Sequence, residues 1–422
     1  MSGNKQPIVI KTSKEKGITK LRRTNNLPLR KHTPILPIIV ISQFCCTSLW
    51  FAGNGIMNEL ITNFQLNDSA LAHLTSSVQF GFIIGTLLFA ILTIADRFPP
   101  SKVFFFSALL GALFNLGIIW KGNNLESLIV LRFLTGFFLA GIYPVGMKIA
   151  ADYYDKGLEK SLSFLVGALV LGTAFPHLMN GITNMISWKH ILYTTSSIAV
   201  LGGMLMLFFV PNGPYRKPSK NINLSAFSSV FKSPSFKSAA FGYFGHMWEL
   251  YTFWAFVPIL LKTYNYIHPN TTFNIPVLSF FIIGIGGLGC ILGGYLSQKH
   301  GTKKIAFITL FLSGICCLFL PIIFMVDNEN LFISFLLFWG IVVIADSPLF
   351  STLVAQNVNP EIKGTALTIV NCIGFSITII SIQLINSLRE ISDSNSIYLV
   401  LALGPIFGLI SLSRKHKTFT KI

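Results

Sequence analysis

The sequence predicts an all-α polytopic membrane protein with twelve transmembrane helices in two pseudo-symmetric six-helix bundles. Long apolar runs recur along the whole chain. Only 11% of the residues are charged and the mean hydropathy is +0.66, whereas soluble domains carry about 25% charged residues. The third observation is a similarity between the two halves of the sequence. Together these three observations indicate a chain that is mostly embedded in the lipid bilayer.

The apolar runs give twelve candidate membrane spans. A helix that rises 1.5 Å per residue needs about 20 residues to cross a hydrocarbon core of about 30 Å. We expect the spans at residues 34–57, 71–94, 103–120, 127–151, 162–185, 190–210, 238–261, 276–297, 304–325, 331–355, 364–386 and 396–413.

The long polar segment 211–237, which is rich in Pro, Ser and Lys, divides these spans into six and six. The expected regions are a basic cytoplasmic tail (1–31), an N-terminal six-helix bundle (32–210), a cytoplasmic linker loop (211–237), a C-terminal six-helix bundle (238–413) and a cytoplasmic tail (414–422).

The two halves share features at a constant offset. Trp50 in the first span and Trp254 in the seventh lie 204 residues apart, as do Pro144 in the fourth and Pro348 in the tenth. Proline lacks a backbone N–H, so both prolines predict a bend in their helices. Parallel repeats of six helices predict two bundles with a binding site between them.

The basic residues fall mostly on one side of the predicted topology. With both ends on the same side, the tails and loops on that side hold 26 Lys and Arg, against four on the other: Lys121, Lys189, Lys262 and Arg389. Cytoplasmic loops are enriched in Lys and Arg. We therefore expect a multi-pass protein of the inner (plasma) membrane with both termini cytoplasmic. The net charge of +17 indicates contact with anionic lipid rather than with nucleic acid.

The polar tail and the cysteines add two further expectations. The tail has neither an apolar core nor a small-residue cleavage site, so it is not a signal peptide and the first span should remain a helix. All six cysteines fall inside predicted spans without metal-ligand spacing, which favours packing roles. We expect no metal and no cofactor.

Two loop segments identify the chain as similar to the major facilitator superfamily. "ADRFPPSK" (95–102) follows the second span and "LSQKHGTKK" (296–304) follows the eighth, and both resemble the family's glycine-, acid- and base-containing loop signature. The resemblance implies a conformational switch formed by Asp96, Arg97, Lys102, Gly294, Gly301 and Lys303. The alternative is that these are simply basic cytoplasmic loops.

A looser resemblance points to one branch of that family. The segments "SLWFAGN", "AGIYPVGMKIAADYY" and "GHMWELYTFWAFVP" are similar to cyanate/nitrate-type bacterial permeases. Nitrate carriers of the superfamily have arginines in helices 2 and 8, and the second and eighth spans here contain none. This difference argues against nitrate itself.

Arg132 is the principal candidate for binding solute. With Gly136 it matches the family's fourth-helix motif, and Tyr143 falls near Arg132 on an unbroken helical wheel. A charge at membrane depth costs about 2.5–3.5 kcal/mol, so it usually faces a cavity or a partner. We expect a substrate-binding cation in a central cavity. The alternative is a side chain that extends to the membrane surface.

Three further residues are candidate substrate contacts: Trp50, Trp254 and Asp346. The two tryptophans belong to an aromatic group that could line a cavity or serve only in packing. Asp346 precedes Pro348 and could instead cap a helix that restarts there.

His246 and Glu249 are the candidate proton-coupling pair. They lie three residues apart in the seventh span, so their side chains share a helix face. Ionisable residues inside membranes often form proton relays. The alternative is a neutral, hydrogen-bonded pair that fixes the helix against its neighbours.

The function implied by the family resemblance is secondary active transport. The sequence contains no ATP-binding motif and no protease or hydrolase signature, so we expect no enzyme. The expected activity is proton-coupled uptake (symport) of a small organic or inorganic anion by a monomeric permease. Export of a drug, metabolite or metallophore by proton antiport is an alternative, and so is a sensor without flux.

Overall fold

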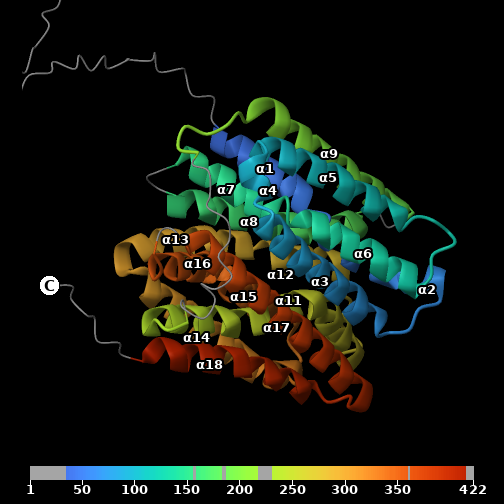
Figure 1. Ribbon diagram of the computed structural model, residues 1–422. Helices are drawn as coiled ribbons and strands as arrows, with labels where there is room; N and C mark the ends of the chain where they lie inside the picture. The colour runs from blue at the N-terminus through green and yellow to red at the C-terminus, as the bar shows by residue number, and fades with distance from the viewer. Residues whose placement is uncertain (1–34, 155–157, 183–186, 217–230, 360–361, 415–422) are drawn as a thin grey trace, which may run out of the picture. The chain divides into compact units, whose positions relative to one another are not determined.

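The computed structural model describes residues 35–154, 158–182, 187–216, 231–359 and 362–414 (Figure 1). Its regular structure over these residues is helical. The predicted N-terminal tail (1–31) lies outside the described residues, and so does the predicted C-terminal tail (414–422) except for Arg414. The predicted linker is described only at 211–216 and 231–237.

The first half of the chain forms the first six membrane passes. Its helices are α1 (Ile35–Thr47), η1 (Asn54–Ile56), α2 (Met57–Phe64), α3 (Ala70–Ile91), α4 (Ile94–Arg97), α5 (Pro100–Gly117), α6 (Leu125–Leu139), α7 (Tyr143–Tyr153), α8 (Leu158–Ile182) and α9 (Lys189–Phe209).

The second half forms the other six. Its helices are α11 (Pro234–Ile267), α12 (Ile275–Gly284), α13 (Gly286–His300), α14 (Thr302–Phe324), α15 (Glu329–Ala345), α16 (Ser347–Gln356), α17 (Lys363–Ile391), η3 (Asn395–Ala402) and α18 (Leu403–Ser413).

The predicted fold class is confirmed. Within the described residues, ten helical segments are long and apolar enough to cross a membrane. The remaining two passes are α11, with 34 residues, and the first span, which α1, η1 and α2 divide between them. Large apolar side chains such as Phe106, Phe208 and Leu288 are exposed along the helices, as expected for surfaces that face lipid.

The first span differs from its prediction as one helix over 34–57. Helix α1 ends at Thr47, an irregular turn follows, and α2 continues to Phe64. The break is stabilised by Arg132, which donates hydrogen bonds to the carbonyl oxygens of Leu49 and Trp50. Backbone groups at membrane depth need such partners. The hydropathy pattern does not reveal the break, because the broken segment is as apolar as a helix.

The fourth and tenth spans are broken at matching places, as the prolines predict. Helix α6 ends at Leu139 and α7 begins at Tyr143, with Pro144 in its first turn. Helix α15 ends at Ala345 and α16 begins at Ser347, with Pro348 in its first turn. Proline suits the first turn because the N–H that it lacks has no acceptor within the helix there.

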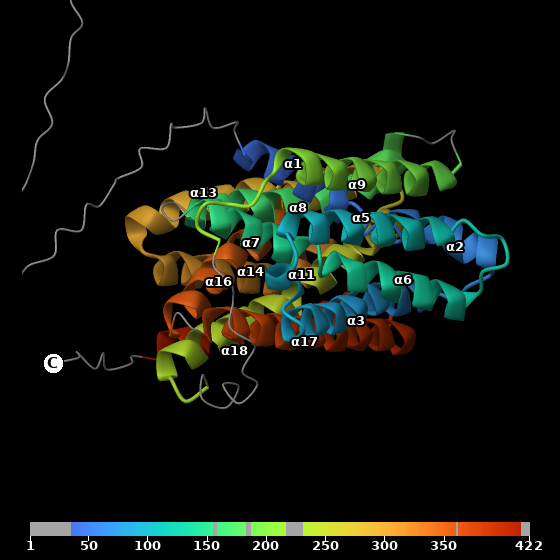
Figure 2. The same cartoon turned by 45° about the horizontal axis from the view of Figure 1, so that its top comes forward.

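The two halves meet along two helix pairs. Helix α3 lies beside α17, and α8 lies beside α12 and α13 (Figure 2). The second contact is close because glycines face each other: a Cβ atom at Gly167 would lie 3.3 Å from the carbonyl oxygen of Gly287. Small residues allow membrane helices to approach at this distance.

Several of the basic loops meet at one end of the helices. The backbone N–H of Tyr215 donates to the carbonyl oxygen of Asp152 over 3.0 Å. Arg216 donates to the carbonyl oxygens of Asp96 (2.9 Å) and Phe98 (3.0 Å). We call this the inner end and the opposite one, which holds α2 and the α5–α6 loop, the outer end. The division into two bundles and the membrane sidedness remain predictions.

Cysteine labelling in intact cells tests the sidedness. We expect an impermeant thiol reagent to label Lys121→Cys and Asp327→Cys, because both are in outer-end loops poor in basic residues. Asn212→Cys and Lys232→Cys should react only after the membrane is permeabilised. The parent chain is the control, because its cysteines are buried apart from the half-buried Cys45. Labelling of Asn212→Cys or Lys232→Cys in intact cells would show that the true topology is the reverse of the predicted one.

Candidate functional site

A large cavity lies at the outer end, between helices of the first and second halves. Its volume is about 1040 Å³, near the upper limit of the 300–1,000 Å³ typical of small-molecule sites. Most of its lining residues fall within positions 54–61 of the first half and within positions 255–267 and 389–398 of the second, though not every residue in these ranges lines it. A solute in this cavity would therefore contact both halves.

Polar side chains occur at the deep end of the cavity as well as at its mouth. His177 of α8 lines the cavity, is only 3% exposed and has no partner for its Nε2 atom among the described residues. Asn180, one turn further along α8, donates to the carbonyl oxygen of Gly55 over 2.7 Å. Buried polar atoms without a protein partner are typical of places where water or a ligand binds.

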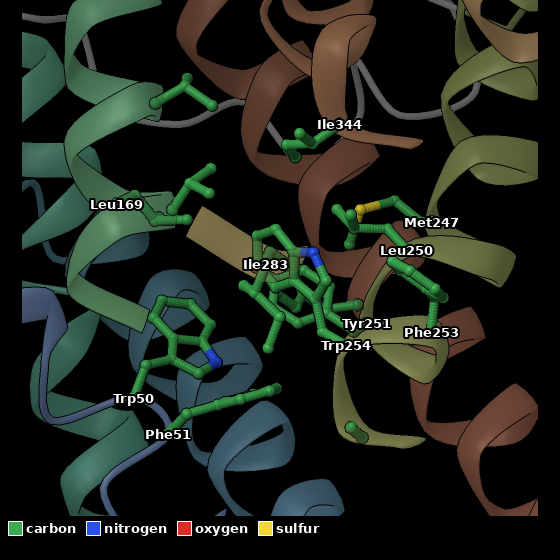
Figure 3. Packing of buried hydrophobic residues seen from close by; sticks show 14 of the residues in the cluster. Trp50, Phe51, Leu169, Met247, Leu250, Tyr251, Phe253, Trp254, Ile283 and Ile344 are labelled. Carbon is green, nitrogen blue, oxygen red and sulfur yellow. The ribbon is translucent and has the colours of Figure 1, made fainter. Parts of the chain in front are cut away.

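Packed aromatic rings close the space on the inner side of the cavity. Trp50 stacks against Tyr251 and Phe375, with ring centroids 5.8 and 5.7 Å apart. Phe82 packs against Trp50 from the first half at 4.8 Å. Figure 3 shows Trp50 of the first half facing Tyr251 and Trp254 of the second. We call Trp50, Phe82, Tyr251 and Phe375 the aromatic layer. Within it, Tyr251 lies about one turn of α11 before the cavity-lining Ala255, and Trp50 lies four residues before the cavity-lining Asn54.

Arg132 is enclosed by the first half. It is 1% exposed, so its charged group does not reach the membrane surface. The guanidinium donates to Leu49 O over 3.1 Å and to Trp50 O, while its Nε has no partner among the described residues. Gly136 packs against the backbone of Val78, so α3 occupies the gap that this glycine leaves.

The predicted shared face of Arg132 and Tyr143 assumed one continuous helix. This assumption is wrong, because residues 140–142 separate α6 from α7. Tyr143 is half-buried at the start of α7. Neither residue lines the outer cavity, and the same is true of Trp50, Trp254 and Asp346. Both tryptophans are buried, and their indole N–H groups have no partner among the described residues.

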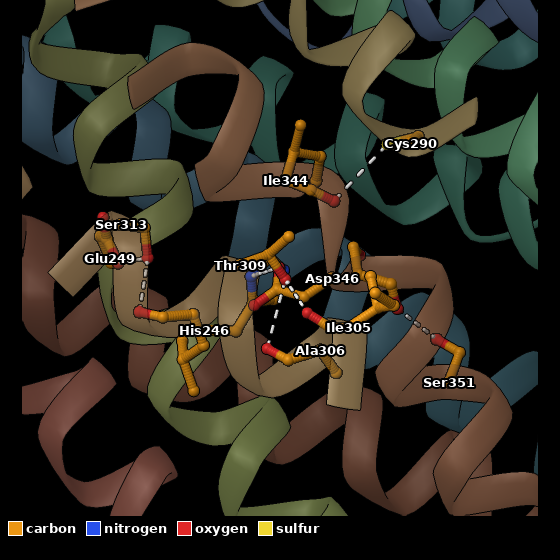
Figure 4. Close-up of polar contacts among 12 residues, drawn as sticks. His246, Glu249, Cys290, Ile305, Ala306, Thr309, Ser313, Ile344, Asp346 and Ser351 are labelled. Carbon is orange, nitrogen blue, oxygen red and sulfur yellow. Dashed lines mark hydrogen bonds and ion pairs between the residues drawn. The ribbon is translucent and has the colours of Figure 1, made fainter. Parts of the chain in front are cut away.

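His246 pairs with Asp346 rather than with Glu249. The distance between His246 Nδ1 and Asp346 Oδ1 is 2.8 Å, and both side chains are 1% exposed (Figure 4). Asp346 stands before α16, as a capping residue would, but its side chain does not cap that helix. No described residue is hydrogen-bonded to Asp346 Oδ2 or to His246 Nε2. The pair joins the seventh pass to the break in the tenth.

Glu249 is held by two donors from other helices. Trp339 Nε1 donates to one carboxyl oxygen over 2.5 Å and Ser313 Oγ to the other over 2.9 Å. Glu249 is 1% exposed. The group joins α11 to α14 and α15. The sequence identified this buried acid, but it did not predict the two donors.

The first predicted switch loop is bound to the end of α7. Lys148 Nζ lies 2.8 Å from Asp96 Oδ1 and 3.8 Å from Asp152 Oδ1. Arg97 Nε donates to Thr93 Oγ1 over 3.1 Å. Lys102 is exposed in the first turn of α5. Asp96 of this loop therefore connects the second pass to the fourth pass of the same half through its ion pair with Lys148.

The second switch loop has a different role in packing. Gly294 of α13 lies against Ser163 of α8, where a Cβ atom would overlap the serine hydroxyl. Gly301 has φ = 91°, a conformation that favours glycine, between α13 and α14. Lys303 is exposed in the first turn of α14. Gly294 thus belongs to a close contact between the halves at the inner end.

Sequence reasoning did not identify the residues that line the outer cavity. It assigned no binding role to His177 and counted Arg389 only as a charge on the side opposite the termini. Both lie on the cavity wall, His177 from α8 and Arg389 from α17. No local motif marks either position, because passes distant in the sequence form the wall.

Comparison with known proteins identifies the family. The model of the Major Facilitator Superfamily matches residues 39–382. The chain is 27% identical over 195 residues to the 4-hydroxybenzoate transporter PcaK of Acinetobacter baylyi, a match that covers 44% of the chain and 41% of PcaK. It is 27% identical over 163 residues to the efflux pump FUBT of Fusarium oxysporum, covering 37% of the chain and 27% of the pump.

These matches thus span about a quarter to two-fifths of the curated relatives' length. A solved structure of the proton:xylose symporter XylE, bound to 6-bromo-6-deoxy-D-glucose, has the same fold. The TM-score is 0.70 at 14% identity, with 89% of this chain and 94% of that chain covered. Because the family model covers most of the sequence and the fold agrees, the chain belongs to the Major Facilitator Superfamily of membrane transporters.

Proposed function

We propose that the protein is a secondary active transporter that takes up a small anion together with protons. The observation that carries this proposal is the outer cavity. Both halves line it, and the aromatic layer closes its inner side. A site between two bundles, open to one end only, is the arrangement that alternating access requires. In this state the solute would enter from the outer end.

The chemical class of the solute rests on two further observations. Lys262 and Arg389 are cations on the cavity wall. The relative PcaK is named for 4-hydroxybenzoate, a carboxylate. We therefore favour an organic anion. An inorganic anion is the alternative solute, suggested by the resemblance to cyanate/nitrate-type permeases.

The buried candidates would form the inner part of the solute pathway. We assign Arg132, Tyr143, Trp50, Trp254 and Asp346 to substrate contacts made after the halves separate at the inner end. Separation breaks the Trp50–Tyr251 and Trp50–Phe375 stacks and frees the indole N–H groups for a solute. The inner loops, through Asp96, Arg97, Lys102, Gly294, Gly301 and Lys303, would stabilise the state closed at this end.

Export is the second candidate function. The match to the efflux pump FUBT supports it, because that protein is named for efflux. The helix-5 segment "GALVLGTAFPHLMNG" lacks the adjacent Gly-Pro typical of drug/proton antiporters of the superfamily, which favours uptake. We place the protein in the plasma membrane as a monomer with cytoplasmic termini.

Transport by the purified protein tests the proposal. Proteoliposomes with an imposed pH gradient, acidic outside, should accumulate radiolabelled 4-hydroxybenzoate or another carboxylate from a panel, because inward proton flow drives uptake. Collapse of the gradient with a protonophore should abolish accumulation. Accumulation only when the gradient is reversed would indicate antiport and overturn uptake. Absence of any flux across the panel, with correctly inserted protein, would favour the sensor alternative.

Arg132 is predicted to be required for transport. Arg132→Ala should abolish uptake and lower the melting temperature, because two buried carbonyls lose their donor at about 1–3 kcal/mol each. Arg132→Lys should retain part of the uptake and part of the thermal stability, because an ammonium keeps the charge without the forked geometry of a guanidinium. Lys121→Ala, which removes an exposed cation outside the cavity, is the control. Near-normal uptake by a correctly inserted Arg132→Ala variant would exclude a role in transport.

Glu249 is predicted to couple proton movement to transport. Glu249→Gln mimics the protonated acid and keeps an oxygen that can accept from Trp339 or Ser313. Counterflow exchange should therefore survive, while accumulation driven by the pH gradient should be lost. Glu390→Gln removes an exposed carboxylate of α17 and is the matched control. If Glu249→Gln still concentrates solute in response to the gradient, the coupling acid lies elsewhere, and the His246–Asp346 pair is then the next candidate.

A further inference from the structure

Arg389 is held on the cavity wall in an unusual way. Its guanidinium carbon lies 5.8 Å from the centroid of the Phe256 ring. Phe256 is 1% exposed, so it gives the cation a fixed support in α11. Such a contact orients a guanidinium while leaving its N–H groups free to bind an acceptor.

The guanidinium of Arg389 has no anionic partner among the described residues. The nearby acid Glu390 accepts instead from Asn386 over 2.9 Å. Arg389 itself is half-buried and forms no ion pair with the described carboxylates. An arginine that is partly removed from water usually has a partner, because its desolvation is costly. Here the space in front of it is the cavity.

Other charges in the cavity are less well placed to bind a solute. Lys262, Asp68 and Asp393 are exposed, so solvent and salt screen them. Glu59 is half-buried on the opposite side, in α2. On the wall contributed by the first half, His177 presents an unpartnered Nε2 atom at the deep end. The cavity therefore offers a fixed cation on the second half, while the first half contributes His177 and the acid Glu59, whose Oε2 atom also has no partner among the described residues.

We propose that Arg389, seated on Phe256, binds the acidic group of a small organic acid in the outer cavity. The guanidinium fork matches a carboxylate in bidentate geometry. A solute held by Arg389 of α17 that also reaches α8 would bridge the two halves and favour closure of the outer end. This proposal rests on the proposed function in treating the cavity as the route of the solute.

Charge-selective thiol labelling tests Arg389 without knowledge of the substrate. Ser392 lines the cavity, is half-buried and follows Arg389 by three residues at the end of α17, so Ser392→Cys places a thiol on the cavity wall close to Arg389. The probes are a negatively charged sulfonatoethyl and a positively charged trimethylammonioethyl methanethiosulfonate. Rates are measured on purified protein in neutral detergent. The parent chain, with its own six cysteines, gives the background rate.

The ratio of the two rates reports the local potential. In the Ser392→Cys protein we expect the anionic probe to be favoured. Adding Arg389→Gln should lower the ratio of anionic to cationic rates at least about fourfold, as expected for loss of one charge within about 10 Å. Adding Arg389→Lys should preserve most of the preference. The matched control is Lys189→Gln, because Lys189 also lies over an aromatic ring, 5.9 Å from the centroid of Trp188, but outside the cavity lining.

The proposal would be overturned by no preference for the anionic probe, by a preference that Arg389→Gln leaves unchanged, or by an equal loss with Lys189→Gln. Failure of both probes to reach the Ser392→Cys thiol would also overturn it, because the cavity would then be closed to solutes. The assay involves no transport. Loss of uptake with retained charge selectivity would therefore refute the proposed function and leave the anion site intact.

Discussion

The hydrogen bonds from Arg132 to the carbonyl oxygens of Leu49 and Trp50 are the interaction on which the arrangement of the first half depends. At membrane depth a helix can break only where other groups satisfy its backbone. Arg132 does this for the first pass and thereby fixes the backbone that carries Trp50. The Trp50 side chain then stacks on Tyr251 and Phe375 of the second half and closes the inner side of the cavity. One buried cation thus connects the fourth pass, the broken first pass and the contact between the halves.

The second half uses buried polar groups for a similar purpose but distributes them differently. His246 and Asp346 join the seventh pass to the break in the tenth, and Glu249 joins the seventh to Trp339 and Ser313. The breaks before Pro144 and Pro348 match between the halves, whereas the groups around them do not. The first half places a fixed positive charge at the break in its first pass, whereas the second places an acid and a histidine at the break before Pro348. The second half thus buries two acids, Glu249 and Asp346, together with His246, and we therefore propose proton coupling there.

Hydropathy, the constant offset of 204 residues and the two loop segments were sufficient to predict twelve passes, two related halves and the superfamily. Pro144 and Pro348 predicted two helix breaks because proline acts locally on its own backbone. The break after Thr47 was missed, since it depends on Arg132 from another helix. The same limit applies to the site: the charge of Asp346 is visible in the sequence, but its pairing with His246 depends on how α11 packs against α16. Arg389 and His177 were missed because only the folded chain brings α17 and α8 to one cavity.

The central claim is that the aromatic layer holds the inner end closed while the outer cavity is open. Distances between spin labels measure this most directly, with one pair at the outer end (Asn58→Cys and Ser394→Cys) and one at the inner end (Phe98→Cys and Lys304→Cys), all at exposed positions. Trp50→Ala removes the central ring of the layer. The account predicts that this substitution lengthens the inner distance and shortens the outer one in the same population of molecules. Unchanged distances at both ends, or a change at the inner end without the opposite change at the outer end, would contradict it.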